Sequence, residues 1–156
     1  MKVKLIQVNK TSSGWLLEGV SEYVKRLSNY IPLEIKDIEI QLSKAKTKDL
    51  QLQMECDKIM QLIKPADYVV LLDDKGKLFT SEEMAEWLNK KFSGISSDLI
   101  FVIGGAYGFH EILKNRANEK ISLSKMTFTH QMVRLIFLEQ LYRALTILKN
   151  EPYHHS

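Results

Sequence analysis

Hydrophobic residues recur along the chain with two alternating periods, one typical of strands and one typical of helices. Val3, Leu5 and Val8 mark a first strand, and apolar residues then recur at helical spacing between positions 15 and 27. The alternation continues to the end of the chain. It predicts strands at residues 31–40, 68–72, 99–103 and 121–123, and helices at residues 49–63, 80–94, 111–117 and 132–148.

Strands that alternate with helices predict an α/β fold in which helices cover both faces of one sheet. The apolar run 68–72 is continuous, as expected for a parallel strand buried on both faces, and residues 73–77 then turn the chain. Thr80 and Glu83 have the spacing of a capping box for the next helix. Ligands of such sheets bind beyond the carboxyl ends of the strands, so we expect the loops at 72–76, 104–108 and 124–128 to converge.

The composition is that of a single globular domain. The chain has 156 residues, of which 45% are hydrophobic and 26% charged, and its formal net charge is +3. This length is enough for a core, and the first residues lack the apolar block of a signal peptide, so we expect one cytoplasmic domain over residues 1–156 with no membrane segment. The single cysteine, Cys56, lies in an apolar helical pattern, which favours a place in the core. The lysine-rich segment 44–48 favours a solvated loop over an RNA-phosphate contact.

Glycines gather directly after the strand predicted at 99–103, where Gly104, Gly105 and Gly108 occupy three of five positions. Such a loop lets the backbone approach a small molecule closely, because glycine has no Cβ. The spacing is not the G-x-G-x-x-G of dinucleotide-binding loops, and the sequence contains neither a Walker loop nor a zinc-type Cys/His cluster. The pattern predicts a cofactor pocket without a metal.

The final predicted helix is apolar on nearly every face between residues 132 and 148. Such a helix must be buried, and at the end of a small domain a partner subunit is the expected cover. We therefore expect a homodimer. Glu139 and Arg143 are four residues apart on one helix face, close enough to pair. The pair either stabilises the helix or serves an interface or active site, and the sequence leaves both interpretations open.

Four motifs occur together in an order that is similar to one enzyme family. They are Ile103-Gly104-Gly105-x-x-Gly108, Leu123-Ser124-Lys125-Met126-Thr127-Phe128 with His130 after it, Glu139-Gln140-Leu141-Tyr142-Arg143-Ala144, and Pro152-Tyr153-His154. Together with Glu22-Tyr23 and the strand end Leu72-Asp73, they extend the similarity over essentially the whole chain. The chain resembles the RlmH-type 23S rRNA pseudouridine N3-methyltransferases of the SPOUT superfamily.

This resemblance implies a single-domain SPOUT-type α/β fold with a C-terminal trefoil knot, and an obligate homodimer. It implies S-adenosylmethionine as the methyl donor and N3 of a pseudouridine in helix 69 of 23S rRNA, within the assembled ribosome, as the acceptor. The implied catalytic residues are Glu139, Arg143, Tyr153 and His154. The implied cofactor-binding residues are Leu72, Gly104, Gly105, Leu123, Ser124, Lys125, Met126, Thr127 and Phe128.

Several points stay open at this level. The pseudouridine N3 has to lose its proton, and His154, Glu139 and His130 are all candidates to accept it or to hold the base. Thr129 stands where the family usually has a proline, so this loop is expected to be less rigid. His155-Ser156 replaces a usual basic ending. The alternatives are a non-catalytic RNA- or nucleotide-binding dimer with the same fold, and a related SPOUT methyltransferase that acts on transfer RNA.

Overall fold

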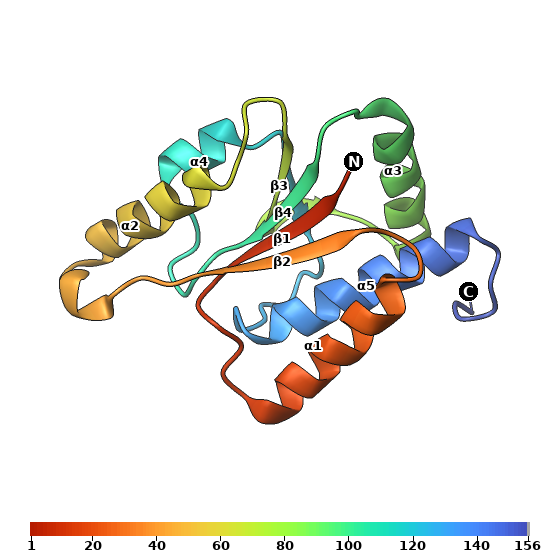
Figure 1. Ribbon diagram of the computed structural model, residues 1–156, viewed down its shortest axis with the longest axis horizontal. Coiled ribbons are helices and arrows are strands. Elements are labelled where there is room, and N and C mark those ends of the chain that lie inside the picture. Colours follow the sequence, from red (N-terminus) through yellow and green to blue (C-terminus); the bar gives the residue numbers. More distant parts are fainter. Residues whose placement is uncertain (156) are drawn as a thin grey trace.

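A computed structural model describes residues 1–155 and contains one five-stranded sheet between two layers of helices (Figure 1). Neighbouring strands all pair in parallel, in the order β2-β1-β4-β3-β5. The elements are β1 (Val3–Val8), α1 (Gly14–Leu27), β2 (Leu33–Ile38), the short 3₁₀ helix η1 (Leu42–Lys44), α2 (Lys48–Gln61), β3 (Tyr68–Leu78), α3 (Ser81–Gly94), β4 (Leu99–Ile103), α4 (Glu111–Arg116), β5 (Glu119–Ser122) and α5 (Met132–Leu148).

The side chains of the sheet alternate between its two faces, and both faces are covered. In the central strand β4, Phe101 and Ile103 belong to the core cluster formed with α1, α3 and α5. Ile100 and Val102 belong to the second cluster, formed with α2 and α4. All residues of β4 are buried, which accounts for its continuous apolar sequence. The prediction of an α/β fold with helices on both faces is confirmed.

The third strand extends beyond its predicted end. The sequence predicts a turn at residues 73–77, but Leu72 and Lys77 both pair with Ile121, so the residues between them bulge out and the strand resumes. Gly76 permits this close approach, because a Cβ there would lie 2.6 Å from backbone atoms of Ile121. The prediction of a turn that ends the strand is therefore wrong.

The observed bounds of three short elements also differ from the predicted ones, because polar residues interrupt their hydrophobic pattern. The strand β5 begins at Glu119, two residues before its prediction, because its pairing with β3 already starts opposite Val70. The Glu119 carboxylate also accepts hydrogen bonds from Trp87 Nε1 at 2.9 Å and from the Tyr68 hydroxyl. The strand β2 is confined to the residues that pair with β1 and is shorter than predicted. The sequence pattern did not predict η1. The final helix has its predicted bounds.

The first turn of α5 is tied to the carboxyl end of β1 by Arg134, which is fully buried. Its guanidinium donates hydrogen bonds to the carbonyl oxygens of Val8 at 2.5 Å and Asn9 at 2.9 Å, and to Thr11 Oγ1 at 3.1 Å. Burial lowers the pKa of Arg134. The hydrophobic pattern identified the helix but not this buried cation. It holds α5 beside the strand ends, where the loops converge.

Local predictions are also confirmed. Thr80 and Glu83 form the expected capping box at the start of α3. Cys56 is buried in the core cluster on the α2 side of the sheet. Within residues 1–155, no helix combines the length and the apolar character needed to cross a membrane.

Candidate active site

A cavity of about 470 Å³ opens at the carboxyl ends of β3, β4 and β5. Its volume lies within the range of about 300–1,000 Å³ that is usual for small-molecule sites. The three loops predicted to converge do so around it. The lining residues are Leu72, Asp73, Asp74, Ile103, Gly104, Gly105, Ala106, Gly108, Phe109, Ile121, Ser122, Leu123, Ser124, Met126, Thr127, Phe128, Thr129, His130 and Val133.

The glycine loop after β4 is a tight turn that only glycine accommodates at two points. The Gly108 N–H donates to the Gly105 carbonyl oxygen at 3.2 Å, and Gly108 has a φ of +79°. At Gly104, a Cβ would lie 2.7 Å from the Gly108 carbonyl oxygen. The loop therefore places bare backbone on the cavity wall, as the sequence predicted.

The loop after β5 is shaped by its own serines. Ser122 Oγ donates to the Ser124 carbonyl oxygen at 2.7 Å, and the Met126 N–H donates to Ser124 Oγ at 2.9 Å. This fold directs Leu123 and Met126 to the cavity wall. Lys125 is exposed and lies outside the lining, unlike the other predicted cofactor-binding residues, all of which line the cavity. That these residues bind a cofactor stays a prediction.

Two residues on the cavity wall precede α5. The Thr129 hydroxyl accepts the Met132 N–H at 3.1 Å and so satisfies the first backbone donor of α5, whose N-cap residue Gln131 makes no such side-chain bond. His130 is half-buried, and burial, together with the charge of Arg134, lowers its pKa. The environment of His130 thus favours the neutral imidazole over the charged form.

A buried carboxylate supports the glycine loop from behind. Glu55 of α2 is 3% exposed, and a Cβ at Gly105 would lie 2.8 Å from its Oε1. Burial raises the pKa of Glu55, while hydrogen bonds from the Gln51 side chain and the Gly105 backbone oppose that rise. Its Oε2 has no hydrogen-bond partner among the described residues. Glu55 was not predicted as a site residue, because α2 carries several polar residues and nothing in the sequence distinguishes Glu55 from the others.

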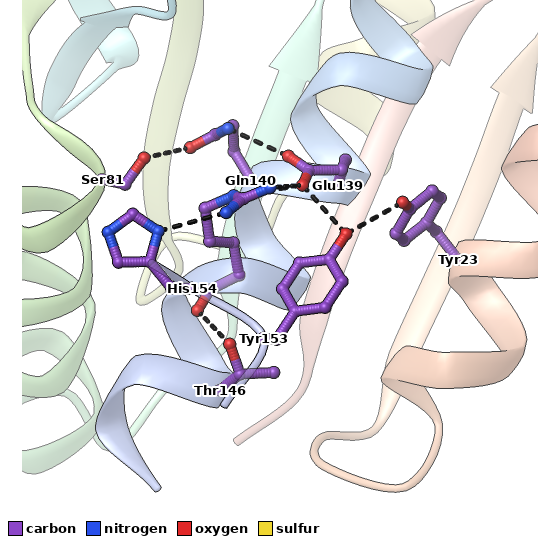
Figure 2. Close-up of polar contacts among 8 residues, drawn as sticks. Tyr23, Ser81, Glu139, Gln140, Thr146, Tyr153 and His154 are labelled. Atoms are coloured by element: carbon purple, nitrogen blue, oxygen red, sulfur yellow. Dashed lines mark hydrogen bonds and ion pairs between the residues drawn. The ribbon is translucent and has the colours of Figure 1, made fainter. Parts of the chain in front are cut away.

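The four predicted catalytic residues form a second cluster, which we call the tail cluster: Glu139, Arg143, Tyr153 and His154 (Figure 2). Glu139 Oε1 accepts hydrogen bonds from Arg143 Nη2 at 2.5 Å and from the Tyr153 hydroxyl at 3.0 Å. The Tyr153 hydroxyl also lies 3.1 Å from that of Tyr23 on α1. Burial and the neighbouring Tyr23 and Glu139 raise the pKa of Tyr153, so its phenol stays protonated.

His154 completes the cluster through both ring nitrogens. Arg143 Nη1 lies 3.1 Å from His154 Nδ1, and Glu82 Oε1 lies 2.8 Å from His154 Nε2. Because a guanidinium only donates, Nδ1 accepts and Nε2 carries the proton that is shared with Glu82. This hydrogen bond is the largest cause of the lowered pKa of Glu82. The pair of Glu139 and Arg143, left open by the sequence, is therefore part of a connected polar network.

The tail cluster and the cavity lie at different points along α5. Val133, in the first turn, lines the cavity, whereas none of the tail-cluster residues does. A rise of about 1.5 Å per residue puts Arg143 about 15 Å farther along the helix axis than Val133. Figure 1 shows α5 running from the loops below the strand ends to the opposite side of the molecule, where the C-terminus lies. The two groups do not meet within one chain.

Comparison with known proteins identifies the family. The family model described as "Predicted SPOUT methyltransferase" matches residues 1–154. The chain belongs to the SPOUT methyltransferase family. The resemblance seen in the sequence is thereby confirmed.

Relatives of this SPOUT methyltransferase match it along its whole length. A protein of Parabacteroides distasonis named "Ribosomal RNA large subunit methyltransferase H" is 51% identical over 157 residues, which cover 100% of both chains. Proteins of the same name from Cytophaga hutchinsonii and Geobacter sp. strain M21 are 46% and 44% identical, over 99% and 100% of this chain and 100% of their own lengths.

Membership of this family makes the cavity the candidate binding site for a methyl donor. A SPOUT methyltransferase needs a site for its methyl donor, and the cavity is lined by the motifs on which the resemblance rests. Phe109, Ile121 and Val133 line the cavity as well, although the sequence did not predict them as cofactor-binding residues. Their apolar character and position at element ends are equally typical of core residues, so no signal distinguished them. Asp73 and Asp74 were expected only as part of a converging loop.

Proposed function

We propose that this SPOUT methyltransferase methylates N3 of a pseudouridine in helix 69 of 23S rRNA, with S-adenosylmethionine as the donor and the assembled ribosome as the substrate. The names of the full-length relatives support a large-subunit rRNA substrate. The observation that carries the proposal is the cavity, which gathers the glycine loop and segment 122–130 at the strand ends. Family membership also supports a C-terminal trefoil knot and a cytoplasmic protein.

The cavity residues fit S-adenosylmethionine. Apolar side chains of Leu72, Leu123 and Met126 offer surface to an adenine ring, and the adjacent backbone offers hydrogen bonds to its edge. Gly104 leaves space that a Cβ would fill. The carboxylates of Asp73 and Asp74 supply acceptors for hydroxyl or ammonium groups. No metal is needed, since the sulfonium group already activates the methyl group.

The position of the tail cluster supports a homodimer. Within a single chain Arg143 lies about 15 Å along α5 from Val133, and none of the tail-cluster residues lines the cavity, so a second copy is needed to bring a tail over it. The first turn of α1 exposes Trp15 by 64% and Leu17 by 50%, an apolar surface that a partner can cover. The faces of α5 are themselves largely covered by the sheet, α1 and α3. The expectation that a partner subunit covers α5 is therefore wrong, and the case for a dimer rests instead on the exposed part of α1 and on the position of the tail cluster.

The residues of such a composite site have distinct tasks. Bound S-adenosylmethionine would supply an activated methyl group for in-line attack by the pseudouridine N3, and the residues on the cavity wall would hold and orient it. Glu139 is engaged by several donors and acts by positioning Arg143 and Tyr153. His130 lines the cavity and is placed to accept or hold the N3 proton, whereas both ring nitrogens of His154 are engaged by Arg143 and Glu82, and one of these contacts has to open before His154 can hold the base. Tyr153 offers a ring for stacking against a base.

Complementation between subunits tests this proposal. One variant lacks residues 153–156, and the other carries Gly104→Val, so neither alone has both a tail and a cofactor loop. Random mixing makes half of the dimers mixed, each with one intact composite site, and restores about a quarter of wild-type methyl transfer to ribosomes. A mixture as inactive as its components contradicts the shared site. An inactive wild-type protein contradicts the function itself.

A further inference from the structure

The lysine-rich segment 44–48, which ends at the first residue of α2, contacts the glycine loop through Lys48, although about sixty positions separate Lys48 from Tyr107 in the sequence. Lys48 Nζ is 5.4 Å from the centroid of the Tyr107 ring. Tyr107 stands between Ala106 and Gly108, both of which line the cavity, yet its own side chain is 48% exposed. The ring therefore lies on the rim of the cavity and faces solvent.

Apart from the contact of Lys48 with the Tyr107 ring, the charges of this segment face solvent. Lys44, Lys46 and Lys48 are exposed, and within residues 1–155 none of them has a carboxylate within salt-bridge distance. Between residues 41 and 50 the only acidic residue is Asp49. Cations at the start of a helix oppose its dipole, and all three lysines precede or open α2. Helix stability thus gives no reason for them.

An exposed aromatic ring beside unpaired lysines has the chemistry that binds unpaired nucleotides. Bases stack on aromatic faces, and lysines neutralise the phosphates that connect them. We propose that Tyr107, Lys44, Lys46 and Lys48 form an RNA-contact surface that holds nucleotides flanking the target at the mouth of the cavity. This surface rests on the proposed function, because it presumes that the acceptor is RNA. It reverses the prediction of a merely solvated loop.

The test compares two triple variants that remove the same charge. One replaces Lys44, Lys46 and Lys48 by serine, and the control replaces Lys2, Lys36 and Lys90, which are exposed elsewhere, by serine. Methyl transfer to ribosomes is measured as a function of ribosome and salt concentration. The first variant is expected to raise KM for ribosomes about tenfold and to flatten the slope of log affinity against log salt by about two, whereas the control changes neither. Calorimetry with S-adenosylmethionine should give wild-type affinity for both.

Tyr107 is tested by a matched pair of substitutions. Tyr107→Phe keeps a ring for stacking and should keep the wild-type KM, whereas Tyr107→Ala should raise it about tenfold with unchanged cofactor affinity. A raised KM with an unchanged salt slope in the lysine variant means that the contact is with a ribosomal protein, and overturns the assignment to RNA. Wild-type kinetics in the lysine triple variant and in Tyr107→Ala would refute the RNA-contact surface. The proposed function would not be affected, because the wild-type protein is active in the same assay. An inactive wild-type protein overturns both.

Discussion

Adding a single methyl group at Gly104 tests whether the glycine loop holds the cofactor. A Cβ at this position would lie 2.7 Å from the Gly108 carbonyl oxygen and 3.1 Å from Phe109 Cε1. The first of these neighbours is backbone, so no rotamer change relieves the contact. The turn that Gly105 and Gly108 close must therefore shift as a unit away from its position on the cavity wall.

The magnitude follows from the cost of overpacking. Forcing one methyl group into a packed site costs about 1–3 kcal/mol, because neighbours move off their preferred positions. In the free variant the loop can relax away from its wild-type conformation. It has to return to that conformation to bind S-adenosylmethionine, so the cost lowers the affinity for the cofactor. At about 1.4 kcal/mol for each tenfold change, Gly104→Ala should weaken S-adenosylmethionine binding by about 5- to 150-fold. Gly104→Val, with two further carbons, should abolish measurable binding.

Calorimetry with S-adenosylmethionine measures this effect, and circular dichroism and urea unfolding confirm that the variants are folded. Gly94→Ala is the matched control, because a Cβ there meets nothing within 4 Å and the residue lies at the end of α3. It should bind like the wild type. A folded Gly104→Val protein with wild-type affinity would remove this loop from the cofactor site.

Three further predictions concern the tail, the assembly and the buried carboxylate. Deleting residues 153–156 should leave cofactor affinity nearly normal and lower methyl transfer to ribosomes by about a hundredfold, and near-normal turnover would return the catalytic role to Glu139, Arg143 or His130. Sedimentation at micromolar concentration should show a dimer, and a stable monomer would refute the composite site. Burial raises the pKa of Glu55, so its ionised form destabilises the fold and stability is lost as pH rises through that raised pKa. In urea unfolding, Glu55→Gln should therefore gain stability over the wild type at pH 8 but not at pH 4, and equal gains at both would contradict the assignment.

The fold was predictable from the sequence as far as the hydrophobic period reached. The central strand β4 and the helix α5 have their predicted bounds, because most of their buried side chains are apolar. The hydrophobic period did not predict the element bounds where polar or glycine residues take part in the packing. Glu119 pairs with Val70 in the sheet while its carboxylate is held by Trp87, and the bulge after Leu72 depends on the close approach that Gly76 allows.

The sequence predicted the loops that line the cavity and the residues of the tail cluster, but not how these two groups lie relative to each other. The glycine loop and Leu123 were expected at the cavity because loops at the carboxyl ends of parallel strands converge. The catalytic candidates do cluster, yet the sequence did not show that they lie away from the cavity, because it did not assign Val133 to the cavity wall. Arg134 and Glu55 could not be assigned either, since burial of a charged residue depends on partners that are far away in the sequence.

Methyl transfer from labelled S-adenosylmethionine to assembled ribosomes, isolated large subunits and naked 23S rRNA, run in parallel with transfer RNA, tests the central claim most directly. The labelled nucleotide is then located by nuclease digestion and mass spectrometry. The account predicts label in the assembled ribosome, on N3 of one pseudouridine in helix 69. Label on transfer RNA, on another position of 23S rRNA, or on no RNA at all would contradict it.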